Sequence, residues 1–143
     1  MDVKSQIADY LNGLSGNQQG QMRQLHGFLL EWFPGVRLWF SDGRNEDGKI
    51  VSNPSIGYGQ YWQIYANGNR KELFQVGISS NKTGISIYVL GIKDKHWLSE
   101  NFSKSIGKAI VTGYCIKFRI LSDISLEVLK VALQEGVRKS STV

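Results

Sequence analysis

The chain has 143 residues, of which 41% are hydrophobic and 20% charged, and its formal net charge is +5 at pH 7. These proportions are typical of a globular protein, and one domain of this length buries roughly 68 to 70% of its unfolded surface on folding. No apolar run approaches the ~18 residues that a membrane span needs, so the composition excludes a membrane protein and predicts a soluble one.

The start of the chain, MDVKSQIADYL, has an acid at position 2 and an interrupted apolar pattern. A signal peptide would have a basic start and a continuous apolar segment, so we expect no export. The only cysteine is Cys115, which excludes an internal disulfide and a multi-cysteine zinc site. This usage fits a reducing compartment, and we expect the protein in the cytoplasm.

The positive charge is not concentrated in one motif. Six basic and only two acidic residues lie between Lys93 and Arg119, but they are spread over the whole segment. Net charge bears on solubility and steering rather than on fold, and nucleic-acid binding needs clustered cations. We therefore interpret this segment as a solvated basic surface and expect no nucleic acid as partner.

The first third of the chain has the apolar spacing of helices. Apolar residues recur every three or four positions from Val3 to Leu14, which predicts a short amphipathic helix over Asp2 to Gly13. A second stripe runs from Met22 to Phe33 and ends at Pro34 and Gly35. We expect the two helices to form a hairpin.

From Val36 the period of the pattern changes to two, which is typical of strands. Alternation predicts strands over 36–41, 56–66, 74–79, 85–89 and 114–120, and residues 50–51 as the start of another. Asn67 to Asn69 should turn the 56–66 strand back as a hairpin, so that Phe74, Val76 and Ile78 share a buried face.

The C-terminal part predicts helical turns within 93–106 and a last helix from Leu126 to Val137, capped by Asp123 or Ser125. The short connections exclude the crossovers of a parallel sheet. We therefore predict a single α+β domain over 1–139, with a frayed tail at 140–143. It should have an N-terminal helical hairpin, an antiparallel sheet of about five strands and a C-terminal helix packed on the sheet.

Candidate catalytic and metal-binding groups are few. Cys115 could act as a nucleophile if His26 or His96 lay beside it, but a lone cysteine in a strand is more often a packed residue. The cluster Asp42, Glu46 and Asp47 lacks the acid spacing and closing Glu of a calcium loop. We therefore predict no catalytic residue, no metal site and no cofactor.

Gly107 and Lys108 do not make a phosphate-binding loop, because Phe102 stands where its first glycine would be and no Ser or Thr follows the lysine.

A run of glycines and aromatic residues follows Ile56: Gly57, Tyr58, Gly59, Gln60, Tyr61, Trp62 and Tyr65. Glycine within a strand often marks a bulge or a close backbone approach. The aromatic side chains either cover both faces of a central hairpin or lie exposed, where they could stack on a planar ligand.

The chain resembles the YdhG-like family of domains of unknown function over nearly its whole length. The resemblance is carried by the Gly57, Gly59 and Tyr61 strand, then by Val76–Gly77–Ile78–Ser79 leading to Lys82, Ile87–Tyr88 before Gly91, Gly107–Lys108, Cys115–Ile116–Lys117, Leu121–Ser122–Asp123, and Leu126 to Leu129.

The resemblance implies an α+β domain with an antiparallel sheet and flanking helices. Some relatives are described as frataxin-like intracellular iron chaperones, which bind iron through an acidic ridge around the first helix, where this chain has Asp2 and Asp9. Relatives tend to carry more His and Lys after the Gly–Lys pair. Here Ala109 and Ile110 follow, which leaves Lys108 and Lys117 as candidates for anion binding.

The leading hypothesis is a small cytoplasmic binding or adaptor domain without a catalytic centre, for an unknown small molecule or protein partner, as a monomer or homodimer. Its predicted ligand-binding residues are Tyr58, Tyr61, Trp62, Tyr88, Lys108 and Lys117. The alternatives are a frataxin-like iron-binding chaperone and an enzyme that uses Cys115.

Overall fold

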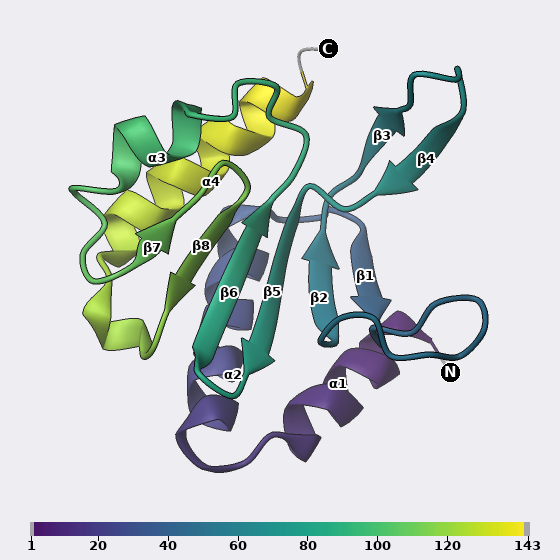
Figure 1. The fold of residues 1–143 in the computed structure, drawn as a ribbon. Helices are drawn as coiled ribbons and strands as arrows, with labels where there is room; N and C mark the ends of the chain where they lie inside the picture. The colour runs from purple at the N-terminus through teal and green to yellow at the C-terminus, as the bar shows by residue number, and fades with distance from the viewer. Residues whose placement is uncertain (1, 142–143) are drawn as a thin grey trace.

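The computed structural model describes residues 2–141 and has the predicted α+β architecture (Figure 1). Its helices are α1 (Val3–Gly13), α2 (Gly16–Trp32), α3 (Trp97–Phe102) and α4 (Leu126–Ser141), with a single 3-10 turn at Leu121–Asp123. Its strands are β1 (Leu38–Ser41), β2 (Ser55–Tyr58), β3 (Tyr61–Ile64), β4 (Arg70–Leu73), β5 (Val76–Asn81), β6 (Gly84–Val89), β7 (Ile110–Val111) and β8 (Cys115–Phe118).

Six strands form one sheet in the order β1-β2-β5-β6-β8-β7, and every neighbouring pair is antiparallel. The strands β3 and β4 form a separate hairpin that projects from the sheet, and we call residues 61–73 the arm (Figure 1). The helices α2 and α4 lie behind the sheet in this view, and α1 lies at its lower end in contact with β1. The opposite face, which is toward the viewer, is the open face.

The period-two pattern explains the core, because alternate side chains of a strand point to opposite faces. Ile56, Ile78, Ile87 and Ile116 are fully buried and occupy successive strands at paired positions, where they meet the helices. The first helix begins at a side-chain cap. The carboxylate of Asp2 accepts a hydrogen bond from Ser5 N (2.7 Å).

Of the two residues predicted to cap the last helix, the serine does so. The hydroxyl of Ser125 accepts a hydrogen bond from Val128 N (3.2 Å) at the start of α4. Asp123 lies in the 3-10 turn instead. The last helix runs on to Ser141, and Ser140 is buried, so positions 140–141 of the predicted tail are helical; residues 142–143 lie outside the described residues.

The predicted strand 56–66 is wrong as one element, because it is broken between β2 and β3. Gly59 has a φ of +78°, which side chains other than glycine rarely adopt, and Gln60 is exposed. The turn at Asn67–Asn69 is confirmed, but it closes the arm rather than the main sheet. The expected strand at 50–51 is reduced to an isolated bridge between Arg44 and Ile50, whereas the short β7 was not predicted.

Phe74 lies on the face opposite to the predicted one. Gly57 and Gly77 are cross-strand partners, and a methyl group added at either would lie 2.6 Å or 2.5 Å from Phe74 ring carbons. The ring therefore covers the glycine pair on the open face, while Val76 and Ile78 face the helices. Because the two glycines have no side chains, they leave the space that this ring fills.

Among the described residues, no helix has the length and apolar character needed to cross a membrane.

We expect Gly77→Ala to lower the free energy of unfolding by about 1 to 3 kcal/mol, because the new methyl group would overlap the Phe74 ring. Urea denaturation measures this cost. The cost should shrink in a Phe74→Ala background, where the ring is gone. The control is Gly27→Ala in α2, where a methyl group meets no atom within 4 Å and should stabilise the helix. An equal cost of Gly77→Ala in both backgrounds would contradict the packing explanation.

Candidate functional site

The six predicted ligand-binding residues do not form one site. Tyr58 points into the core and is 1% exposed, so its inclusion in a surface site is wrong. Tyr61 and Trp62 lie on the arm. Tyr88, Lys108 and Lys117 lie around the open face near β6 and β8, and they belong to one neighbourhood.

Tyr58 has a structural partner in α2. Its hydroxyl lies 2.6 Å from His26 Nδ1, and the two rings are tilted with centroids 5.7 Å apart. Burial raises the pKa of Tyr58 well above its ordinary value and lowers the pKa of His26. Both groups are therefore neutral at pH 7, and the pair joins the sheet to the second helix.

The second group lies beside the base of the arm. Tyr61 and Trp62 line a shallow hollow of about 400 Å³ together with Gly91, Ile92 and Lys93. Trp62 is 50% exposed, and the guanidinium of Arg70 lies over its ring at 4.9 Å. One face of the tryptophan is thus already covered by a cation from the same arm.

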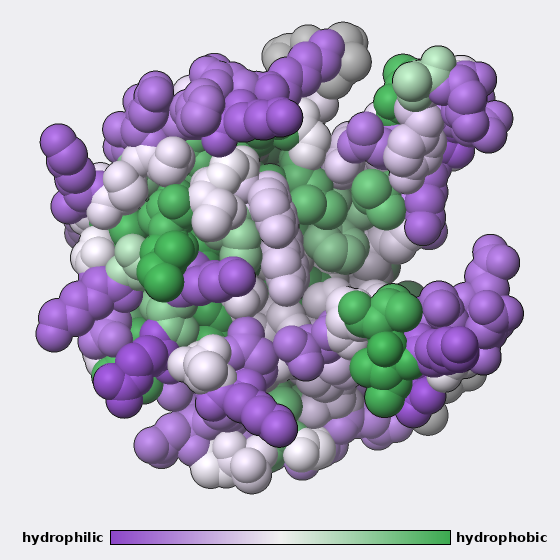
Figure 2. All heavy atoms as spheres, viewed as in Figure 1, coloured by the Kyte–Doolittle hydropathy of each residue, from purple (hydrophilic) through white to green (hydrophobic). Residues whose placement is uncertain are grey.

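Another hollow lies at the end of the open face where β6 and β8 meet the residues before β7, and we call it the sheet-end hollow. Its volume is about 520 Å³. The apolar residues that line it are Ile85, Ala109, Ile110, Phe118 and Ile120, and the polar ones are Asn81, Thr83, Ser86, Lys108, Lys117, Arg119 and Asp123. Figure 2 shows hydrophobic surface over β7 and β8, bordered by hydrophilic residues.

A second hollow of about 450 Å³ adjoins it on the open face. The two share Asn81, Thr83, Ser86 and Lys117, and the second adds Asn53, Lys82 and Tyr88. Ser86 is small and buried, and it accepts a hydrogen bond from the Asn81 amide (3.1 Å). The small side chain leaves the open face hollowed between larger neighbours.

Lys108 is placed by a close approach of two backbones. Gly107 has a φ of +114°, and a side chain there would collide with the carbonyl oxygen of Asp123. The next residue, Lys108, donates its N–H to that same carbonyl (2.9 Å). The Gly107–Lys108 pair therefore fixes the rim of the sheet-end hollow, which is a structural role rather than that of a phosphate loop.

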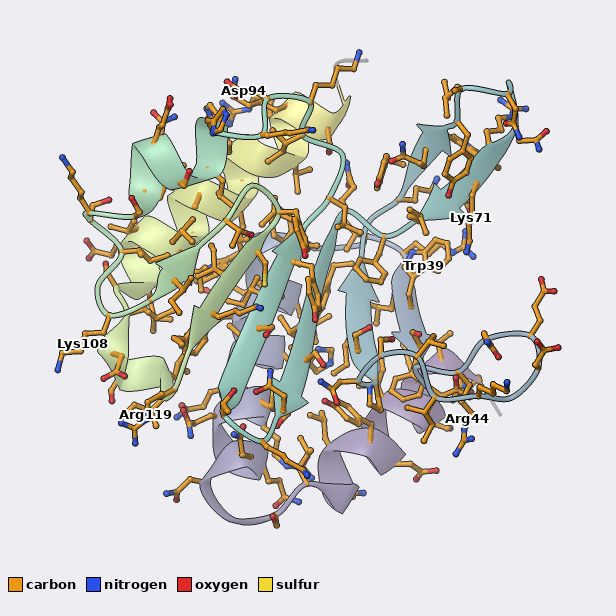
Figure 3. All side chains as sticks on the ribbon, in the orientation of Figure 1. Trp39, Arg44, Lys71, Asp94, Lys108 and Arg119 are labelled. Carbon is orange, nitrogen blue, oxygen red and sulfur yellow. The ribbon has the colours of Figure 1, made fainter. Side chains whose placement is uncertain are left out.

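Three cations surround the sheet-end hollow. Lys117 and Arg119 come from β8 and the residue that follows it, and Figure 3 shows Lys108 and Arg119 extended toward solvent from its rim. The ion pairs among residues 2–140 are Arg37–Glu72 and Arg138–Glu135, so none of the three is in an ion pair there. Asp123 is the one carboxylate that lines the hollow.

Cys115 lies on the open face beside Tyr88 but is only 1% exposed. Burial raises the pKa of its thiol, and the nearby Lys117 ammonium only partly offsets this. The ring of His26 is hydrogen-bonded to the Tyr58 hydroxyl. His96 lies at the start of α3, where its backbone N–H donates a hydrogen bond to the Asp94 carboxylate. The thiol is therefore the dominant form at neutral pH, which does not favour a nucleophilic role.

Sequence reasoning included Lys108 and Lys117 but missed Arg119 and the apolar Ile110 and Ile120. The signal for Arg119 was present, since it alternates with Lys117 in the strand pattern. Asn81 and Thr83 had no such signal, because only the pairing of β6 with β8 brings their turn beside the hollow.

Comparison of the chain with protein-family models, with curated proteins and with solved structures gives no match. The YdhG-like resemblance therefore rests on the sequence motifs alone, and the function must be argued from the geometry.

We expect Cys115 to react with a thiol reagent at neutral pH at least about tenfold more slowly than a free peptide cysteine, because reaction requires the sheet to open and the pKa is raised. Absorbance after addition of Ellman's reagent measures the rate, and the urea-unfolded protein is the control. Labelling as fast as the peptide would revive the enzyme hypothesis.

We expect stability to fall on acidification through His26. Its folded pKa lies below the ordinary value of 6.5, so the unfolded chain binds a proton that the folded one does not. Stability is therefore complete above pH 6.5 and is lost as the pH falls toward the folded pKa. In His26→Gln this slope, measured by thermal unfolding, should flatten, whereas His96→Gln at an exposed site should keep it. An unchanged slope in His26→Gln would contradict the assignment.

Proposed function

We propose that this domain is a non-catalytic binding module that holds a small amphipathic organic anion in the sheet-end hollow. The observation that carries the proposal is the combination of apolar lining and unpaired cations in one hollow of about 520 Å³. That volume lies in the range of small-molecule sites, which are mostly apolar with a few placed polar groups.

The apolar part of the ligand would supply most of the affinity. Ile110 is 68% exposed and Ile120 is 43% exposed, and both line the hollow. Covering them removes apolar surface from water at about 25 cal/mol per Å². Exposed apolar side chains that converge on one hollow thus favour a ligand with an aromatic or acyl body.

The charged part of the ligand would be oriented by the cations. Lys117 and Arg119 are two residues apart in the sequence, and Lys108 lies in the segment before β7. Because they are exposed, each is worth only about 0.2 to 1 kcal/mol toward a bound anion. They therefore determine the charge and the orientation of the bound ligand more than its affinity.

The alternative hypotheses receive less support. The described residues contain no group of three or more His, Cys, Asp or Glu side chains placed to hold a metal ion. The iron-chaperone hypothesis therefore stays a prediction from resemblance. An enzyme based on Cys115 would need a more exposed and more acidic thiol than this one.

The test compares two fluorescent probes with the same aromatic body, of which only one is charged: 8-anilinonaphthalene-1-sulfonate and neutral N-phenyl-1-naphthylamine. We expect saturable binding of the sulfonate to the folded protein. The variant Lys117→Gln/Arg119→Gln should weaken it about 2- to 30-fold, as two exposed charge contacts predict. Binding of the neutral probe should not change.

The matched control is Lys93→Gln/Lys104→Gln, which lowers the net charge equally at exposed positions outside the hollow. A second variant, Ile110→Asp, should weaken both probes, because it removes apolar surface from the lining. Equal sulfonate binding by the wild type and the Lys117→Gln/Arg119→Gln variant would refute the site.

A further inference from the structure

The edge of the sheet opposite the hollow is open. The strand β1 pairs with β2 alone. On the β2 side, Arg37 O accepts a hydrogen bond from Gly59 N (2.9 Å). In an antiparallel ladder the backbone groups of alternate residues point away from the partner, so those of Leu38 and Phe40 point outward. No described residue pairs with them there. Natural proteins rarely leave such an edge uncovered.

Two projections flank this edge. One is the arm, and the other is the segment 42–54 between β1 and β2, which we call the edge loop. Figure 1 shows both extending beyond β1, and Figure 2 shows a notch between them. Each carries exposed apolar side chains, with Trp62 50% and Ile64 62% exposed on the arm and Ile50 69% and Val51 66% exposed on the loop.

The two projections carry opposite free charges. Arg70 and Lys71 are exposed on the arm and are in no ion pair among residues 2–140, whereas Glu72 is paired with Arg37. The tip of the edge loop exposes Glu46 and Asp47, which likewise have no ion pair within that part of the chain.

The edge loop carries three carboxylates, Asp42, Glu46 and Asp47, against two cations, Arg44 and Lys49, so its net charge is −1. The guanidinium of Arg44 donates a hydrogen bond to Gly48 O (2.9 Å) within the loop, and Figure 3 shows Arg44 on the side away from the arm. In the same view Lys71 and Trp39 lie beside the notch. The arm, with Arg70 and Lys71 against Glu72, is therefore net positive, and the edge loop is net negative.

These features are self-complementary under a two-fold axis. The arm is joined to the start of β1 by the Arg37–Glu72 ion pair, and the edge loop follows the end of β1 at Ser41. Two β1 edges that meet antiparallel place the start of one strand beside the end of the other. The arm of each copy then faces the edge loop of its partner, which brings the net positive arm to the net negative loop.

We propose that the chain forms a two-fold homodimer in which the β1 edges meet and each arm packs against the partner's edge loop. The occupant favoured by the charges is a second copy, because one chain supplies both complementary surfaces. The sheet-end hollow lies at the opposite end of the strand order, so the dimer leaves it free. The proposal is independent of the proposed function.

A charge exchange tests the arrangement. Variant A is Arg70→Glu/Lys71→Glu, which makes the arm acidic like the loop, and variant B is Glu46→Lys/Asp47→Lys, which makes the loop basic like the arm. In either variant alone both halves of the interface bring like charges together, so we expect dimer affinity to fall about 10- to 100-fold. An equimolar mixture of A and B should dimerise as the wild type does, since each arm then faces a loop of opposite charge.

Sedimentation velocity at high micromolar concentration measures the oligomeric state, and Lys104→Glu/Lys130→Glu is the control for net charge at exposed positions elsewhere. Hydrogen exchange of Leu38 and Phe40 amides should slow as the wild type is concentrated, and should not do so in variant A. Circular dichroism shows that each variant is folded. A monomeric wild type, or dimers that survive in both A and B, would overturn the proposal, as would failure of the mixture to dimerise.

Discussion

The packing of the Phe74 ring on the Gly57–Gly77 pair is the constraint on which the shape of the molecule depends. It fixes the point at which the chain leaves the sheet after β2 and returns before β5. With Gly59 in a left-handed conformation on one strand and Phe74 turned onto the open face on the other, the intervening hairpin cannot continue the sheet. It becomes the arm. One aromatic ring over two glycines therefore separates the sheet from the arm.

Small residues also determine where the open face has hollows. Gly57 and Gly77 are covered by Phe74, and Ser79 donates its hydroxyl proton to Pro54 O (2.6 Å), so this half of the face is filled. On the other half, Ser86 is buried but lines both hollows. The chain thus closes the face near β2 with its own side chains and leaves the end near β8 accessible, where the cations gather.

The sequence pattern predicted what depends on periodicity. The two N-terminal helices, a cap for the last helix at Asp123 or Ser125 and the antiparallel pairing of the strands all follow from local spacing and short connections. The break at Gly59 and the turned ring of Phe74 could not be predicted in this way, because a period of two continues through both positions. Tyr58 was misassigned for a related reason: the pattern shows that aromatic residues alternate, but which face meets α2 is decided by the whole sheet. Lys108 joins Lys117 only through the backbone contact of Gly107 with Asp123.

The two proposed surfaces differ in the physics that would operate on them. At the sheet-end hollow the exposed cations act on a small ligand in high dielectric, so apolar contact must carry the affinity and salt should weaken the charge preference. At the β1 edge, dimerisation would give the backbone groups of Leu38 and Phe40 hydrogen-bond partners that no side chain of the described chain supplies. The charges of the arm and the edge loop would determine which strand edge can pair with β1. The strands β2 and β5 lie between the β1 edge and the hollow at β6 and β8. Binding at one surface therefore need not compete with association at the other.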